Sequence, residues 1–188
     1  MINKQNFDKV KNNLDKFDKK REELIKTSRE IVRESKKIIY SIHRNEKVST
    51  TKIKTSLKSL TILAKKNPKL LYSGSVKIAV QEYVEAIAFL EFNKSGKIIP
   101  YNPEFIDDEF YLLGLCDLSG ELVRKAVQEG INNKNKAVLN IRKAVDELYY
   151  KILELDLRNG ELRKKSDGIK WDLKKLDEMV FSLKLRIP

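Results

Sequence analysis

Apolar residues recur with the three-four spacing of an α-helix along most of this 188-residue chain. In the clearest case, ten positions between Phe7 and Ile38 follow a heptad pattern over more than four turns. Arg21, Ser28 and Ser35 interrupt the apolar seam of this segment. No segment alternates polar and apolar residues for long enough to indicate a sheet. The sequence therefore predicts an all-α protein.

Capping and turn signals divide the chain into its expected helices. After the first long helix, Ser49-Thr50-Thr51 can cap a second helix that ends before Asn67-Pro68. Four further helices are expected: over about 74–92, from Asp107 to near Gly130, over about 136–157 and over about 161–186. These segments predict a six- to seven-helix bundle that forms one domain over residues 1–188. The helices present more apolar seam than one small bundle needs, which favours a homo-oligomer.

The sequence also carries information on the cellular location of the protein. No stretch approaches the roughly 18 to 20 apolar residues of a membrane span, and the first residues do not resemble a signal peptide. We therefore expect a cytoplasmic protein without a membrane partner. Cys116 is the only cysteine, so no internal disulfide can form, and we expect it to fill core volume.

Positive charge is concentrated in the first part of the chain. Residues 1–70 contain 20 Lys and Arg against 8 Asp and Glu, whereas residues 71–188 contain 19 of each kind. No acid occurs between Glu46 and Glu82. A one-sided basic field is typical of proteins that bind a polyanion, most commonly nucleic acid. The alternative is a solvated, lysine-rich surface that serves solubility.

Two pairs of carboxylates lie inside apolar sequence: Glu82 and Glu85 in the expected third helix, and Asp117 and Glu121 in the fourth. Spacings of three and four residues place each pair on one helix face. Burying such groups is unfavourable unless a cation or hydrogen-bond donors compensate them, so a shared divalent cation and salt bridges to Lys or Arg remain alternatives. With one His and one Cys in the chain, the metal would be Mg²⁺ or Mn²⁺ rather than zinc or a di-iron centre.

Three other side chains allow more than one interpretation. Arg21, on the apolar seam, either pairs with an acid of another helix or faces a cavity and contacts phosphate. His43 is expected at the surface or at a helix end. Trp171 lies outside the heptad positions of the last helix, so it packs at an interface or stacks on a base.

Four strings of the sequence resemble members of the translin superfamily. Residues 18–44, 81–86 and 111–122 resemble the first helix and the two catalytic helices of translin-associated factor X, and residues 162–183 resemble the C-terminal helix of translin. A chain with both signatures resembles the single-gene type found in archaea. The resemblance implies an all-helical protomer in a hollow homo-oligomer, an octamer, that binds single-stranded RNA or single-stranded DNA.

The resemblance also implies Mg²⁺-dependent endoribonuclease activity. Glu82, Glu85 and Asp117 fall on catalytic and metal-binding positions, and Glu121, one turn after Asp117, is a further candidate ligand. The alternatives are a nucleic-acid-binding scaffold without catalysis and, from the charge pattern the least favoured, a purely structural oligomer.

The sequence departs from translin in front of the third expected helix. Residues 71–75 replace a basic cluster there, and only Lys77 nearby is clearly basic. Besides Lys77, the candidates for contacts with nucleic acid are therefore Arg21, Lys52, Lys54 and Lys58.

Overall fold

The structure, a computed structural model, describes residues 3–99, 101–104 and 106–185. Within these ranges it contains seven helices and no strands, which confirms the predicted all-α fold. The helices are α1 (Lys4–His43), α2 (Thr51–Lys65), α3 (Pro68–Leu71), α4 (Gly74–Ser95), α5 (Asp108–Ile131), α6 (Asn135–Leu153) and α7 (Glu161–Leu185). None of the described helices is long and apolar enough to span a membrane.

The expected helix boundaries agree with the structure to within about three residues except in α6; α4 continues to Ser95 instead of ending at about residue 92, and the short α3 was not among the expected segments. The prediction carried α6 to about residue 157, whereas it ends at Leu153. The turn that follows bends the chain back, with Asp156 at a φ of 45°, in the left-handed region. The spacing of apolar residues does not predict this backbone conformation, so it did not predict where the helix ends.

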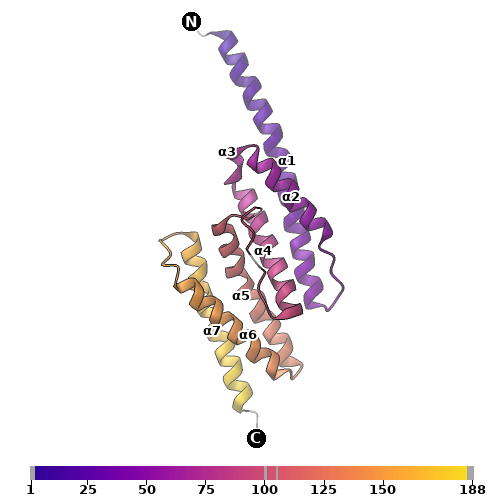
Figure 1. The fold of residues 1–188 in the computed structure, drawn as a ribbon, viewed down its shortest axis with the longest axis vertical. Helices are drawn as coiled ribbons and strands as arrows, with labels where there is room; N and C mark the ends of the chain where they lie inside the picture. Colours follow the sequence, from indigo (N-terminus) through magenta and orange to yellow (C-terminus); the bar gives the residue numbers. More distant parts are fainter. Residues whose placement is uncertain (1–2, 100, 105, 186–188) are drawn as a thin grey trace.

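Four long helices lie side by side in the order α1, α4, α5, α7 and run in the same direction (Figure 1). Lys36 of α1 lies beside Glu82 of α4 and, seven residues further along both helices, His43 lies against Phe89. The contacts of α7 with α5 advance in the same sense, from Lys165 beside Asp117 to Met179 beside Gly130. Helix α2, between α1 and α4 in the sequence, and helix α6, between α5 and α7, run in the opposite direction (Figure 1). Each of them returns the chain to the end at which the long helices begin.

Helix α4 is the centre of the bundle. Eleven of its residues are buried, in agreement with a sequence that is apolar almost all round. It approaches α5 most closely at Gly114, where an added Cβ would lie 2.7 Å from the carbonyl oxygen of Gln81 and 2.7 Å from the Cβ of Val84. The absence of a side chain at Gly114 therefore sets the distance between the two helices that bear the carboxylates.

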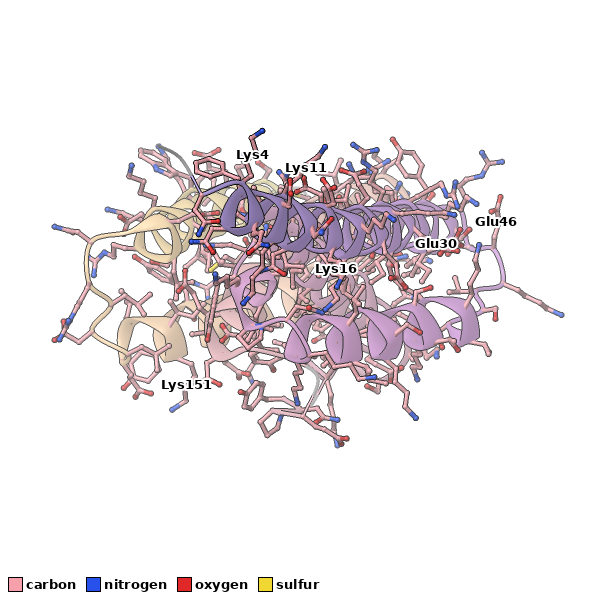
Figure 2. The ribbon with its side chains drawn as sticks, turned by 90° about the horizontal axis from the view of Figure 1, so that it is seen from above. Lys4, Lys11, Lys16, Glu30, Glu46 and Lys151 are labelled. Atoms are coloured by element: carbon pink, nitrogen blue, oxygen red, sulfur yellow. The ribbon has the colours of Figure 1, made fainter. Side chains whose placement is uncertain are left out.

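The heptad seam of α1 is buried only in part. It is partly buried at Phe17 and fully buried from Leu24 onward, whereas the first turns of the helix extend beyond the other helices (Figure 1). In that stretch Phe7, Val10 and Leu14 are 63%, 54% and 59% exposed. Lysine side chains extend from the same turns, Lys4, Lys11 and Lys16 among them (Figure 2). A regular heptad pattern thus continues where the protomer offers no partner surface.

We predict that Gly114→Ala destabilises the protein, by about 1–3 kcal/mol, because the new methyl group meets backbone and a β-carbon that cannot turn aside. As a control, Gly168→Ala on α7 should stabilise by up to about 1 kcal/mol, because its Cβ would meet no atom within 4 Å and alanine favours helix. Urea unfolding of both variants measures the difference. Equal effects of the two substitutions would contradict the tight contact at Gly114.

Candidate functional site

The four predicted carboxylates lie at the centre of the parallel layer. Glu82 and Glu85 project from α4, and Asp117 and Glu121 project from α5. All four side chains are partly exposed, so they line one face of the layer instead of lying sealed in its core. The flanking helices α1 and α7 supply the cations that lie nearest to them.

Asp117 is held from α7 and from α4. The Lys165 ammonium donates to both of its carboxylate oxygens at 2.7 Å, and the side-chain amide of Gln81 also donates to it. Charge-assisted bonds of this kind are about twice as strong as neutral ones. Lys165 is therefore the main cation that the fold itself supplies to the cluster.

Glu121 is held from α1, by the only histidine of the chain. The Nε2 of His43 lies 2.5 Å from the Glu121 carboxylate, and its Nδ1 lies 3.1 Å from the side-chain oxygen of Gln128. The ring also packs on Phe89, and the His43 side chain is only 2% exposed. His43 therefore lies at a helix end, as expected, because it is the last residue of α1, but the alternative expectation of a surface residue is wrong. Arg124 adds a weaker contact at 3.7 Å from Glu121.

Glu85 is the carboxylate whose titration changes most. Burial raises its pKa to about 8, and the negative charges of Asp117, Glu82 and Glu121 act in the same direction against the opposing effect of Lys165. Burial also raises the pKa of Glu82, and Lys36, whose Nζ lies 4.0 Å from the carboxylate, opposes only part of this rise. The four acids therefore share one electrostatic environment that has an excess of negative charge.

A divalent cation fits the chemistry of this donor set, because carboxylate oxygens are the ligands that Mg²⁺ and Mn²⁺ prefer. The side-chain positions, however, do not form a complete metal site. Within the described part of the chain, no three His, Cys, Asp or Glu side chains are grouped closely enough to hold an ion. Lys165 occupies both oxygens of Asp117, so a metal would have to compete with it.

Two other candidates take no part in the cluster's chemistry. Cys116 is buried, as expected of a core residue, and burial raises the pKa of its thiol to about 12, so it remains protonated at neutral pH. Trp171 is exposed on α7, with the Lys174 ammonium 5.8 Å from its ring centroid. Its exposure leaves both of its predicted roles untested.

Two of the lysines predicted to contact nucleic acid, Lys52 and Lys77, form salt bridges with acids of the protein. Lys52 binds Glu30 at 3.1 Å and Glu34 at 3.3 Å, both on α1. Lys77 binds Glu109 at 3.2 Å and Glu161 at 2.9 Å. The acid-free stretch of sequence is therefore not free of acids in the fold.

The other nominated cations are exposed. Lys54 and Lys58 lie on the outer face of α2, and Arg21 lies on α1 before its buried part begins. Among the described residues no acid pairs with Arg21, so the pairing proposed for it does not occur within this protomer.

Sequence analysis missed Lys165, His43 and Gln81, which contact the predicted carboxylates directly. His43 follows Ile39 by four residues on the same face of α1, and this spacing was a signal of burial. Lys165 carries no comparable signal, because one lysine among many on a helix does not reveal which acid it will meet.

Comparison with known proteins supplies the relationship. The sequence model of the Translin family matches residues 19–187. Translin of Gallus gallus is 38% identical over 81 residues, which cover 43% of this chain and 35% of that protein. An uncharacterised protein of Methanocaldococcus jannaschii is 34% identical over 139 residues, which cover 69% of this chain and 61% of that protein. The matched stretch therefore spans about a third of the length of the chicken translin.

Solved structures are similar over nearly the whole chain. The crystal structure of apo-NeC3PO has a TM-score of 0.79 and 28% identity, covering 97% of this chain and 98% of that one. AfC3PO has a TM-score of 0.79 and 25% identity, covering 97% and 100%. The complex of AfC3PO with duplex RNA shares the fold, with a TM-score of 0.79, 24% identity and coverage of 97% and 98%. With the family match extending over residues 19–187, the chain belongs to the translin family.

Proposed function

We propose that this protein binds nucleic acid and cleaves RNA phosphodiesters at the carboxylate cluster with the help of Mg²⁺ or Mn²⁺. The observation that carries the proposal is the shared electrostatic environment of Glu85, Glu82, Asp117 and Glu121 on one accessible face. Two neighbouring acids with raised pKa values, here Glu82 and Glu85, are typical of functional sites. A relative of the same fold, AfC3PO, has been crystallised with duplex RNA.

Each acid has a role that follows from its contacts. Glu85 and Glu82, which no hydrogen bond among the described residues holds in place, are the groups free to take up a cation. Asp117 would join them as a ligand in exchange for its contact with Lys165, and Glu121, fixed by His43, would be a further ligand. Held by these residues, a divalent cation would supply a water of lowered pKa and positive charge beside the scissile phosphate.

The proposed substrate is single-stranded RNA, with single-stranded DNA as a second ligand, and the proposed assembly is a hollow homo-oligomer, an octamer. Apolar side chains exposed at the two ends of the chain support an assembly, among them Phe7 and Leu14 on α1 and Phe181 on α7. A partner subunit would cover surfaces that the protomer leaves open.

A non-catalytic nucleic-acid scaffold is the second candidate. The observation that favours it is the ion pair of Lys165 with Asp117, which neutralises one acid of the cluster without any metal. This candidate requires binding of nucleic acid without cleavage under any metal condition.

We predict that Glu85→Gln abolishes cleavage and leaves RNA binding and assembly near those of the parent, because the amide keeps the shape of the side chain and loses the ligand charge. Labelled single-stranded RNA, incubated with Mg²⁺ or with EDTA, measures cleavage. Glu147→Gln, at an exposed glutamate of α6, is the control. Parent protein that binds RNA but cuts it in neither condition would support the scaffold instead.

Lys165→Gln should tighten the binding of Mn²⁺ to the protein by roughly tenfold, because the ammonium that competes for Asp117 is removed; tenfold corresponds to about 1.4 kcal/mol. Titration calorimetry without RNA measures this affinity. The exposed neighbour Lys170 provides the matched control, Lys170→Gln. Unchanged affinity in Lys165→Gln would place the metal away from Asp117.

Glu85 should also make stability depend on pH in the absence of divalent cations. In the folded protein its pKa is about 8, against an ordinary value of 4.5 in the unfolded chain. Between these values the folded state holds a proton that the unfolded state has released, so the free energy of unfolding falls as pH rises, by about 1.4 kcal/mol per pH unit at most. Chemical unfolding of parent and Glu85→Gln from pH 4.5 to 9 should show a fall in the parent that the variant lacks. Parallel curves would contradict the raised pKa.

A further inference from the structure

A groove of about 850 Å³ lies along α1 and the start of α4. We call it the α1–α4 groove and define it by its lining residues: Ile25, Ser28, Arg29, Val32, Arg33, Lys36, Lys37, Tyr40, Ser75 and Ile78. On α1 the lining extends from Ile25 to Tyr40, and these 15 steps of 1.5 Å give about 22 Å of helix. The groove is therefore long enough for an extended chain of several units.

The rim of the α1–α4 groove is positively charged. Arg29, Arg33, Lys36 and Lys37 line it, and no acid does. Arg33 and Lys37 share a single partner, Glu34, at 3.8 and 3.3 Å. Cations thus outnumber the acids that could neutralise them, which suits a ligand with repeated negative charges.

The floor of the groove is apolar. Ile25, Val32 and Ile78 form it, and the ring of Tyr40 stands at the end nearer the carboxylates. Tyr40 is 59% exposed, and the guanidinium of Arg124 lies 5.2 Å from its ring centroid. An exposed aromatic ring beside an arginine is the arrangement on which single-stranded bases stack.

The groove opens directly onto the carboxylate cluster. On α4, Ile78 precedes Glu82 by four residues and Glu85 by seven, so all three lie on one face of the helix. Lys36 lines the groove and lies 4.0 Å from Glu82. At the Tyr40 end, Arg124 joins the groove to the cluster, because it contacts Glu121 as well.

We propose that the α1–α4 groove binds the single-stranded RNA substrate, with phosphates on Arg29, Arg33 and Lys37 and a base on Tyr40. This inference rests on the proposed function, and it assigns substrate binding to residues that the charge pattern of the sequence did not nominate. A strand bound in this way passes Lys36 and brings a phosphodiester beside Glu82. An unpaired strand is required, because the bases of a duplex are stacked on each other and cannot reach the apolar floor.

The experiment compares two tyrosines of equal exposure. Tyr40→Ala should weaken binding of a fluorescently labelled uridine homopolymer, measured by anisotropy, by roughly 5- to 100-fold, the range of lost base stacking. Tyr150→Ala, on α6, is the matched control, since Tyr150 is 61% exposed and also lies beside a cation, Lys151. Tyr40→Phe, which keeps the ring, should bind like the parent.

A second set of variants tests the phosphate contacts. The double variant Arg29→Ala, Arg33→Ala should lower the slope of log affinity against log salt by about 1.4, since each phosphate contact with a single strand contributes about 0.7. Lys143→Ala, at an exposed lysine of α6, should leave the slope unchanged.

The outcomes separate this proposal from the proposed function. Parent protein that fails to bind RNA would overturn both. Parent protein that binds and cuts RNA, with Tyr40→Ala and the arginine variant unchanged from their controls, would overturn the groove alone. Light scattering on each variant excludes a change of assembly, and a lower mass in the groove variants would show that the groove is a contact between copies of the chain and would also overturn the proposal.

Discussion

The packing of α4 against α5 is the contact on which the rest of the structure depends. These two helices are the most apolar of the chain, and at Gly114 they approach until no side chain fits between them. Along the same contact they bear four carboxylates, and removing such groups from water is unfavourable without compensation. Most of the compensation comes from outside the pair, since Lys36 and His43 belong to α1 and Lys165 to α7. Within the pair, Gln81 donates to Asp117 and Arg124 contacts Glu121.

Periodicity predicted the parts of the structure that depend on local physics. The long helices, the buried character of α4 and the shared faces of the acid pairs all follow from the spacing of apolar residues, which is set by the helix itself. The partners of those acids depend instead on tertiary packing. His43 lies 78 residues and Lys165 lies 48 residues from the acid that it binds, and no pattern within one helix links them.

The pairing of charged side chains also depends on tertiary packing, and the sequence did not predict it. The stretch without acids between Glu46 and Glu82 suggested unpaired lysines, yet Lys52 binds two glutamates of α1, because α2 folds back along the helix that precedes it. Cations outnumber acids instead along the α1–α4 groove, where Arg33 and Lys37 share one partner, Glu34. A linear count of charge located the excess of cations in the first 70 residues but did not show which of these lysines and arginines pair with acids in the fold.

The choice of lysine at position 165 has a physical consequence for the cluster. An arginine would bind Asp117 through two parallel hydrogen bonds from its planar guanidinium group, whereas the lysine ammonium is a compact charge on a flexible side chain. The ammonium can leave its partner by rotation of that side chain, which an arginine held by two parallel hydrogen bonds would resist. Lysine at position 165 therefore compensates Asp117 in this structure and leaves its carboxylate oxygens available to another cation once the side chain rotates.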